Sequence, residues 1–222
     1  MLAPPSALPA TPVPAASAPS GPSLAFDGST IDGGWYTDVT QLARHSARLL
    51  NDVMSAWSSY GLALFALLML VVWWRARRAD AATMARALAV PVVVVLVYGV
   101  DMVLKSVVRE VRPCRSIPHS FTLESCPAPS DWAFPSNHTV IAFSAATALW
   151  LLDRKLGALA FLAAVAMGFS RIWVGAHYPH DVAAGALVGV LVALPLAAAS
   201  ERAAPWVERA RNGRLRPLLA AD

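Results

Sequence analysis

Two histidines stand in short polar clusters, each directly before a long apolar run of the chain. His138 ends the tetrapeptide Pro-Ser-Asn-His, and His177 opens the pentapeptide His-Tyr-Pro-His-Asp, which ends at Asp181. Pro179 suits the first turn of a helix, so Asp181 lies within that turn and its carboxylate can reach back to a ring nitrogen of His177. Such a carboxylate fixes the imidazole tautomer and raises the nucleophilicity of the other nitrogen. The pair predicts nucleophilic chemistry by a histidine, although an isolated His near an Asp is more often structural.

Cationic side chains accompany the histidines in the sequence. Lys105, Arg109 and Arg112 follow one another at intervals of four and three residues, so a helix would carry them on one face before a proline ends it. Ser170 and Arg171 close another apolar run and add a further cation. Cations grouped in this way are costly beside a bilayer unless they face a cavity or an anion, and a phosphate group would supply that anion.

The tetrapeptide before the first apolar run offers a second means of binding an anion. Ser136 is a favourable N-cap residue, so the backbone N–H groups of the next turn, beginning around Asn137 and His138, are free and are assisted by the helix dipole. Each feature alone also has a structural interpretation. Arg109 and Arg171 could extend along apolar surface to lipid headgroups, and Ser136 could cap a helix whose His138 only meets the interface. Because successive spans alternate in direction, all the clusters fall on one side, which favours one shared phosphate site.

The composition indicates a membrane setting for these clusters. The chain has 222 residues, of which 57% are hydrophobic and 14% charged, and its mean hydropathy is positive. We therefore predict an all-α integral membrane protein with about five transmembrane helices, given that a spanning helix needs about 20 residues. The expected spans, of which the third is the shortest, are 57–74, 88–105, 138–152, 156–173 and 180–199.

Basic residues predict the orientation of the spans. They concentrate in two linkers and the C-terminal tail, which alternation of five spans places on one side and the positive-inside rule assigns to the cytoplasm. The polar clusters at 105–138 and 170–181 then lie on the outer side. Since the basic residues do not form a stripe, the net charge of +4 does not indicate nucleic-acid binding. The residues assigned to the cytoplasm are Arg75, Arg77, Arg78, Arg86, Arg154, Lys155, Arg202, Arg209, Arg211, Arg214 and Arg216.

The two ends of the chain differ from the apolar middle. Residues 1–34 are rich in Pro and Ala and lack the charged start and apolar core of a signal peptide, which predicts a disordered leader. Over 35–56, apolar residues recur at helical spacing, which predicts an amphipathic helix in the outer interface with an N-cap at Asp38. A sixth, rather polar spanning helix is the alternative. The transmembrane domain then covers 57–200, and 201–222 form a basic cytoplasmic tail.

Three motifs, in order, resemble the signature of the type 2 phosphatidic acid phosphatase (PAP2) superfamily, and the resemblance implies a PAP2-like helical bundle. Within the superfamily, the runs FPSNHT and SRIWVGAHYPHDVAAG look most like the bacterial bacitracin-resistance type of undecaprenyl-diphosphate phosphatase. One position departs, because the second motif usually has glycine where this chain has Asn137, and the added side chain lies next to the expected headgroup. The motifs are Lys105 with six residues to Arg112-Pro113, then Pro135-Ser136-Asn137-His138, then Ser170-Arg171 with five residues to His177 and three to Asp181.

The resemblance implies a role for each matching residue. His177 would attack the terminal phosphorus and form a phosphohistidine, with Asp181 orienting its ring. His138 would protonate the leaving oxygen and then activate water. No metal or other cofactor is implied, because protein cations take the role that Mg²⁺ plays in other phosphoryl transfers. The phosphate-binding residues would be Lys105, Arg112, Ser136, Asn137, Ser170 and Arg171.

The implied activity is hydrolysis of a polyprenyl (undecaprenyl-type) diphosphate to the monophosphate at the outer face of a bacterial cell membrane. The motifs read only the phosphate, so a phosphatase for phosphatidate or phosphatidylglycerol phosphate stays open, as does a non-catalytic membrane scaffold or lipid transporter. A scaffold would be expected to have lost His177 or His138, and this chain retains both. The motifs carry no information on the lipid chain or the oligomeric state.

Cys114 and Cys126 are the two cysteines of the chain, and both lie in the outer loop between the first two motifs. A disulfide persists outside the cytoplasm and would stiffen the loop that covers the phosphate pocket. Two free thiols, or a zinc site that also uses His119, are the alternatives.

Overall fold

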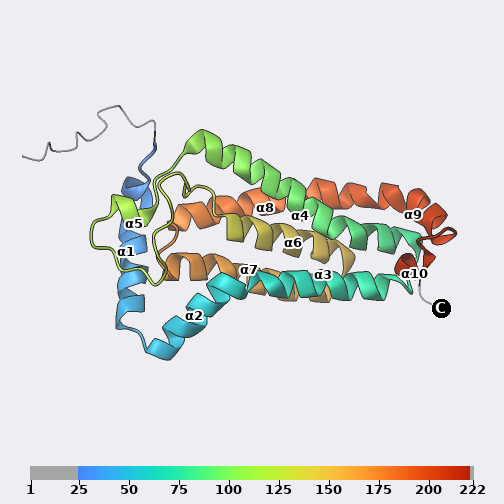
Figure 1. The fold of residues 1–222 in the computed structure, drawn as a ribbon, viewed down its shortest axis with the longest axis horizontal. Helices are drawn as coiled ribbons and strands as arrows, with labels where there is room; N and C mark the ends of the chain where they lie inside the picture. The colour runs from blue at the N-terminus through green and yellow to red at the C-terminus, as the bar shows by residue number, and fades with distance from the viewer. Residues whose placement is uncertain (1–24, 221–222) are drawn as a thin grey trace, which may run out of the picture.

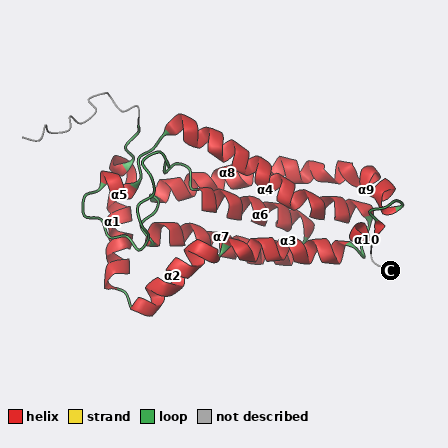
Figure 2. Ribbon diagram, in the orientation of Figure 1, coloured by secondary structure: helices red, strands yellow, loops and turns green. Residues whose placement is uncertain are grey.

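The longest helices lie side by side along the long axis of the molecule, and shorter segments close its two ends (Figure 1). The structure is a computed structural model that describes residues 25–220, so most of the leader expected at 1–34 lies outside the described residues. Regular structure in the described part is helical, apart from one isolated bridge between Phe26 and Glu110 (Figure 2). The all-α prediction is confirmed. The elements are α1 (Ser29–His45), α2 (Arg48–Tyr60), α3 (Leu62–Ala76), α4 (Ala81–Val108), α5 (Pro113–Ser116), α6 (Asn137–Leu152), α7 (Arg154–Trp173), α8 (Pro179–Ala199), the 3₁₀ turn η1 (Ser200–Ala203), α9 (Ala204–Arg211) and α10 (Arg216–Leu219).

Helix α6 lies at the centre of the bundle, where it contacts α3, α4, α7 and α8. Val140, Ala145 and Leu149 are among its fully buried residues, and its sequence is apolar on every side, as expected of a helix surrounded by others. Its 16 residues rise by only about 24 Å, less than the hydrocarbon thickness of about 30 Å. This short length explains why 138–152 is the weakest of the expected spans.

Two glycines of α8 allow it to approach the backbone of α6. A Cβ atom at Gly189 would lie 2.8 Å from the Cβ of Phe143 and 2.9 Å from the carbonyl oxygen of Val140. One at Gly185 would lie 2.9 Å from the carbonyl oxygen of Ser136. The two glycines are one turn apart on the same face, a spacing of small residues that lets membrane helices pack closely. The contact brings the start of α6 beside the start of α8.

The predicted spans correspond to helices that differ in whether they are long and apolar enough to cross a membrane. Helices α4 and α7, and the apolar Pro179–Arg211 segment that begins with α8, are long and apolar enough to cross a membrane. Helices α2 and α3 qualify only together, with a bend of 51° at Gly61 between them. Helix α6 is apolar but short. The span expected at 57–74 begins inside α2, crosses this bend and continues along α3.

The single amphipathic helix expected over 35–56 is also wrong, because the chain forms two helices there. Helix α1 begins at Ser29, so Asp38 is an interior residue and not an N-cap. The break falls at Ser46 and Ala47, whose backbones are extended. Helix α1 lies across one end of the bundle (Figure 1), where the buried Tyr36 hydroxyl donates to the carbonyl oxygen of Gly175 at 3.1 Å. Docking on the α7–α8 turn sets the direction of α1, and α2 then leads away from it toward α3.

The basic segments meet at the opposite end of the bundle from α1. Arg75, at the end of α3, pairs with Asp153 in the α6–α7 turn at 3.1 Å. Arg86 of α4 pairs with Glu201, and Arg211 of α9 donates to a carbonyl oxygen in the α3–α4 linker. These contacts place both basic linkers and the C-terminal segment together, as the alternation of spans predicts.

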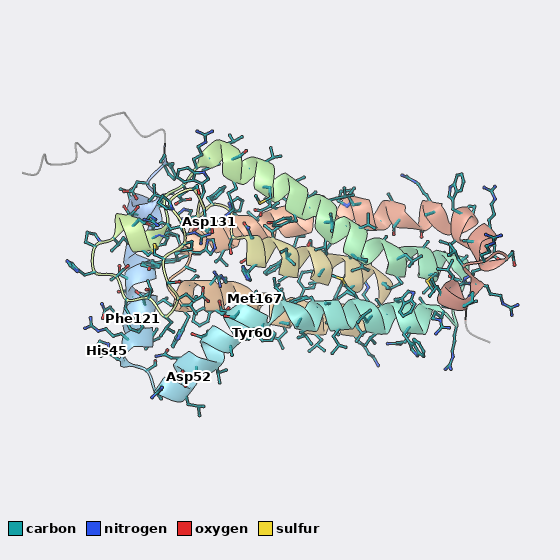
Figure 3. All side chains as sticks on the ribbon, viewed as in Figure 1. His45, Asp52, Tyr60, Phe121, Asp131 and Met167 are labelled. Atoms are coloured by element: carbon teal, nitrogen blue, oxygen red, sulfur yellow. A yellow bond between two sulfur atoms is a disulfide. The ribbon has the colours of Figure 1, made fainter. Side chains whose placement is uncertain are left out.

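The long connection between α4 and α6 gathers at the same end as α1. It contains α5 and a loop, and Phe121 and Asp131 mark its position in Figure 3. A disulfide joins Cys114 to Cys126, with 6.0 Å between the Cα atoms. The loop is held to the bundle by the Leu123 N–H, which donates to the carbonyl oxygen of Val174 at 3.0 Å. The bridge thus closes a loop that lies over the α7–α8 turn.

We expect non-reducing mass spectrometry of membrane-extracted protein to find a peptide that links Cys114 to Cys126. Replacing both cysteines by serine should lower the free energy of unfolding by about 2–4 kcal/mol, because the unfolded chain regains the freedom that the bridge removes. Two alkylatable thiols in protein prepared without reductant would contradict the pairing.

Gly189→Leu should destabilise the bundle because a side chain there overlaps the backbone of α6. We expect a loss of at least about 1–3 kcal/mol, the usual cost of overpacking, measured as a lower midpoint of thermal unfolding in detergent. Gly99→Leu is the matched control, since nothing lies within 4 Å of a Cβ atom at Gly99 in α4. Equal midpoints for the two variants would show that α6 and α8 are not in close contact.

Candidate active site

The turn between α7 and α8 presents His177 to the interior of the molecule. Gly175 has a φ of 82°, a left-handed conformation that glycine adopts at little cost. The chain reverses there, so the N–H groups of Ala176 and His177 donate to the carbonyl oxygen of Arg171 at 3.0 and 3.2 Å. This turn places His177 between the end of α7 and the start of α8.

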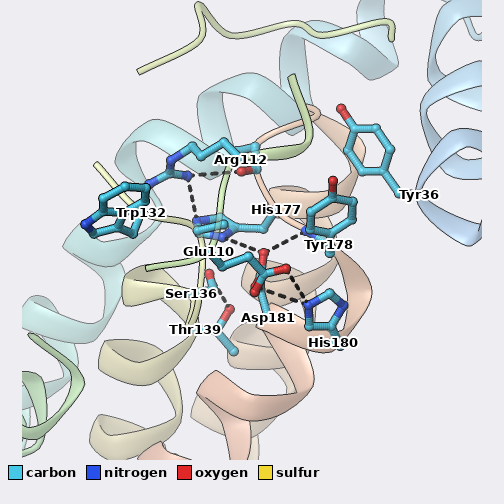
Figure 4. Close-up of polar contacts among 12 residues, drawn as sticks. Tyr36, Glu110, Arg112, Trp132, Ser136, Thr139, His177, Tyr178, His180 and Asp181 are labelled. Atoms are coloured by element: carbon cyan, nitrogen blue, oxygen red, sulfur yellow. Dashed lines mark hydrogen bonds and ion pairs between the residues drawn. The ribbon is translucent and has the colours of Figure 1, made fainter. Parts of the chain in front are cut away.

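Hydrogen bonds define the state of the His177 ring, which is only 2% exposed (Figure 4). Arg112 Nη1 lies 3.1 Å from Nε2, and because a guanidinium can only donate, Nε2 is the unprotonated nitrogen. The proton therefore sits on Nδ1, which donates to Asp181 Oδ2 at 3.3 Å. The same carboxylate oxygen accepts the N–H of Tyr178 at 2.9 Å, which holds it in place. The ring thus carries its lone pair on the side that faces Arg112.

The electrostatic environment keeps this imidazole neutral. Burial lowers the pKa of His177 well below its ordinary value, and the cations of Arg112, Arg171 and Lys105 act in the same direction. Because protonation would block the lone pair, the low pKa preserves a nucleophile over the neutral pH range.

Lys105 and Arg112 lie on different elements, and not on one helix as predicted. Helix α4 ends at Val108, and Arg109 follows with a left-handed φ of 53°. Arg112 instead occupies the N-cap position of α5, while Arg109 is exposed. The prediction of one cationic helix face is therefore wrong, because a left-handed residue ends the helix between the two cations.

Acceptors from the long loop hold two of the cations. Arg112 donates to the carboxylate of Asp131 at 2.9 Å and to the carbonyl oxygen of the same residue at 2.9 Å. Lys105 Nζ donates to the carbonyl oxygen of Trp132 at 2.6 Å. Both cations are nearly buried, so they require such partners. The loop thus supplies oxygens where a phosphate would otherwise bind.

Arg171 is held by a second loop carboxylate that the sequence analysis missed. Its Nη1 lies 3.2 Å from Glu124 Oε1 and also donates to the hydroxyl of Ser58 on α2. Neither Glu124 nor Asp131 belongs to a motif, and the only signal of their role is an acidic residue in a loop between cationic motifs. Two carboxylates therefore form ion pairs with two of the cations that were expected to bind phosphate.

The second motif begins α6, but the phosphate contacts expected of Ser136 in this motif and of Ser170 in the third motif differ. The Ser136 N–H donates to the carbonyl oxygen of Asp181 at 3.1 Å, so this N–H is not available to an anion. The Ser170 hydroxyl is buried and donates to the carbonyl oxygen of Met167 at 2.7 Å, so it does not face the cations. The N–H groups of Asn137 and the following residue lack intrahelical acceptors by helix geometry and stay candidates for anion binding. The ring of half-buried His138 forms no hydrogen bond with any other described residue.

A groove of about 590 Å³ runs beside α4 and is lined in part by Lys105, Asp131 and Asn137 of the site. Lys105, Asn137 and Trp132 line its inner part, and the Oδ1 atom of Asn137 is buried without a hydrogen-bond partner. Tyr98 and Met102 line its outer part and are exposed on the apolar surface of α4. The groove can therefore receive a molecule with a charged head and an apolar tail.

Comparison with known proteins agrees with this geometry. Residues 86–204 match the PAP2 superfamily. Over 146 residues, the chain is 37% identical to the bacitracin transport permease protein BcrC of Bacillus licheniformis, covering 66% of this chain and 70% of that one. It is 27% identical to undecaprenyl-diphosphatase BcrC of Bacillus subtilis, covering 78% and 86% of the two chains.

Solved structures share the fold. Aquifex aeolicus LpxE matches with a TM-score of 0.60 at 23% identity, covering 75% of this chain and 94% of that one. The transmembrane PAP2 type phosphatidylglycerolphosphate phosphatase of Bacillus subtilis matches with a TM-score of 0.57 at 21% identity, covering 77% and 86%. The sequence match spans more than half of the chain and contains the residues that surround His177. The chain therefore belongs to the PAP2 superfamily.

Proposed function

We propose that this protein removes the terminal phosphate of a polyprenyl diphosphate, of the undecaprenyl type, through a phosphohistidine on His177. The observation that carries the proposal is the His177 ring, whose Nδ1–H is held by Asp181 while its unprotonated Nε2 faces a cluster of cations. Relatives named as undecaprenyl-diphosphatases support the choice of substrate.

In the first half-reaction, the lone pair of His177 Nε2 forms a bond to the terminal phosphorus. The bond from phosphorus to the bridging oxygen breaks, and its electrons leave with the polyprenyl phosphate. Asp181 accepts the Nδ1–H throughout and stabilises the positive charge that develops on the ring. Arg112 Nη1, which now faces Nε2, donates instead to a phosphate oxygen, and Lys105 and Arg171 share the remaining charge.

In the second half-reaction, water attacks the phosphohistidine and releases inorganic phosphate. We assign the proton transfers to His138, in the first turn of α6, which protonates the leaving oxygen and then accepts a proton from water. Within the described part of the chain its ring forms no hydrogen bond that would have to break first, so it is free to turn toward the substrate.

The groove beside α4 supports a lipid substrate. A diphosphate can enter with its head toward Lys105 and its chain along Tyr98 and Met102, which lie on the lipid-facing side of α4. The buried Oδ1 of Asn137 has no partner and can accept a hydrogen bond from a protonated phosphate oxygen. A glycine at this position could not make that contact.

Phosphate release from purified protein in detergent tests the function. We expect turnover of a polyprenyl diphosphate to exceed that of a polyprenyl monophosphate, of phosphatidate and of phosphatidylglycerol phosphate. Faster release from either glycerolipid would reassign the substrate, and no release from any of the four would favour a non-catalytic membrane protein.

Substitutions of the two histidines should have unequal effects. His177→Ala removes the nucleophile, so turnover falls to background and no phosphoenzyme forms. His138→Ala slows both half-reactions by about 10² to 10⁴. With a polyprenyl diphosphate labelled in its terminal phosphate, the phosphohistidine then accumulates as acid-labile, base-stable label on His177. His45→Ala, an exposed residue at the end of α1 (Figure 3), is the matched control and should behave as wild type. A correctly folded His177→Ala protein with near wild-type turnover would overturn the mechanism.

We also propose that the site faces outward from a bacterial cell membrane, because the basic segments lie together at the opposite end. In protein whose native cysteines have been replaced, Arg78→Cys should be protected from an impermeant thiol reagent in intact cells. Ser130→Cys, in the exposed loop near the site, should react. The reverse labelling pattern would place the site in the cytoplasm.

A further inference from the structure

A third histidine, His180, lies beside Asp181 in a largely buried polar cluster (Figure 4). Its Nδ1 lies 2.7 Å from Asp32 Oδ1 of α1, and its Nε2 lies 2.8 Å from Glu110 Oε1 in the segment after α4. Its backbone N–H donates to Asp32 Oδ2 at 2.7 Å. The cluster, defined as Asp32, Glu110, His180 and Asp181, therefore joins α1, the α4–α5 connection and α8.

The geometry around His180 requires a positive charge. Ionised carboxylates only accept hydrogen bonds, so with Asp32 and Glu110 ionised each ring nitrogen carries a proton and the ring is an imidazolium. Its Nε2 also lies 3.7 Å from Asp181 Oδ1. Glu110 and Asp181 are fully buried, and the ring of Tyr178 stacks on His180 with centroids 5.3 Å apart. One cation thus faces three carboxylates, those of Asp32, Glu110 and Asp181.

Asp181 connects this cluster to the nucleophile. Its Oδ2 atom binds His177 Nδ1, while its Oδ1 atom faces His180 and has no hydrogen-bond partner. A carboxylate that is attracted on one side by His180 cannot rotate without loss of that attraction. The orientation of Asp181 therefore depends on the charge of His180, which in turn depends on Asp32 and Glu110.

We propose that His180 is a positioning residue: held as a cation between Asp32 and Glu110, it orients Asp181 and thereby the nucleophilic His177. Helix α1 contributes Asp32, so this helix is part of the catalytic apparatus. The kinetic part of this proposal rests on the proposed phosphatase activity.

A metal ion is the competing occupant of the cluster. Glu110, His180 and Asp181 offer donor atoms within 4.8 Å of one another, and one oxygen of each carboxylate is unpartnered. A metal would have to displace the proton on His180 Nε2 and break its 2.8 Å hydrogen bond to Glu110. The imidazolium already supplies the positive charge at this position, so we assign the cluster to a proton and not to a metal.

A substitution at Gly28 is an independent way to perturb the same cluster. A Cβ atom there would lie 1.6 Å from Glu110 Oε1 and 2.8 Å from His180 Cε1. Its φ of −79° suits any residue, so the position needs glycine for space alone. Gly28→Ala therefore displaces the Glu110 carboxylate without altering a polar group. Gly34, in the helix α1 that Gly28 precedes, has nothing within 4 Å of a Cβ atom and is the matched control.

The experiment measures kcat, KM and thermal midpoint for His180→Gln, Gly28→Ala and the controls His45→Gln and Gly34→Ala, with a polyprenyl diphosphate as substrate. We expect kcat to fall by about 10²-fold in His180→Gln and by a smaller factor in Gly28→Ala, the scale of a misplaced catalytic group. KM should stay within about twofold, because Lys105, Arg112 and Arg171 are untouched. Both controls should match wild type.

Unchanged kcat in His180→Gln, or a loss that appears equally in the two controls, would overturn the proposal. So would stoichiometric metal in the purified protein combined with inactivation by a chelator and recovery with zinc. If His180→Gln does not fold, Gly28→Ala decides, since it leaves every polar group of the cluster in place. A Gly28→Ala protein with full activity would then count against the positioning role.

A measurement that does not depend on catalysis distinguishes this inference from the proposed function. Nitrogen NMR of histidine-labelled protein in detergent should show one ring protonated at both nitrogens at mildly alkaline pH, and its signal should be absent from His180→Gln. A wild-type protein that shows the charged ring but hydrolyses no lipid phosphate would refute the phosphatase and leave the charged cluster standing. A neutral His180 ring would refute the cluster whatever the activity.

Discussion

The close contact between α6 and α8 is the constraint on which the arrangement of the site depends. Gly185 and Gly189 remove the side chains that would hold the two helices apart. The Ser136 N–H can then donate to the carbonyl oxygen of Asp181, which joins the first turns of both helices. The second and third motifs are far apart in the sequence, and this packing places their histidines at one site. In a bilayer, where lipid is as apolar as the helices, such backbone approach is a main source of helix association.

The sequence predicts those parts of the site that depend on local spacing. His177 and Asp181 are four residues apart at a helix start, and the helix itself brings them into contact. The residues that contact His177 and Asp181 from distant parts of the sequence leave no periodic pattern in it. Arg112 reaches the site only because Arg109 ends α4, which is decided by tertiary contacts. Helix α1 docks on the α7–α8 turn through Tyr36, a contact that no amphipathic pattern records.

The buried cations explain the role of two acidic residues that the sequence analysis did not identify. Arg112 and Arg171 are nearly inaccessible, and a buried charge without a partner would cost several kcal/mol. Asp131 and Glu124 satisfy these charges in the structure without a ligand. In the proposed reaction, substrate binding would exchange carboxylate for phosphate at these cations, so affinity would reflect the difference between two sets of hydrogen bonds. Acidic loop residues outside every motif thus become determinants of affinity.

The short length of α6 has a consequence for how a lipid is handled. One residue, Asp153, joins α6 to α7, so the two helices share a level at that end. With 16 and 20 residues they rise about 24 and 30 Å, which sets the start of α6 about one helical turn below the end of α7. Lifting a chain out of the bilayer costs about 0.8 kcal/mol for each methylene exposed to water. The proposed phosphate site, recessed in this way, would avoid that cost, because the headgroup could reach the site while the hydrocarbon chain stays in the membrane.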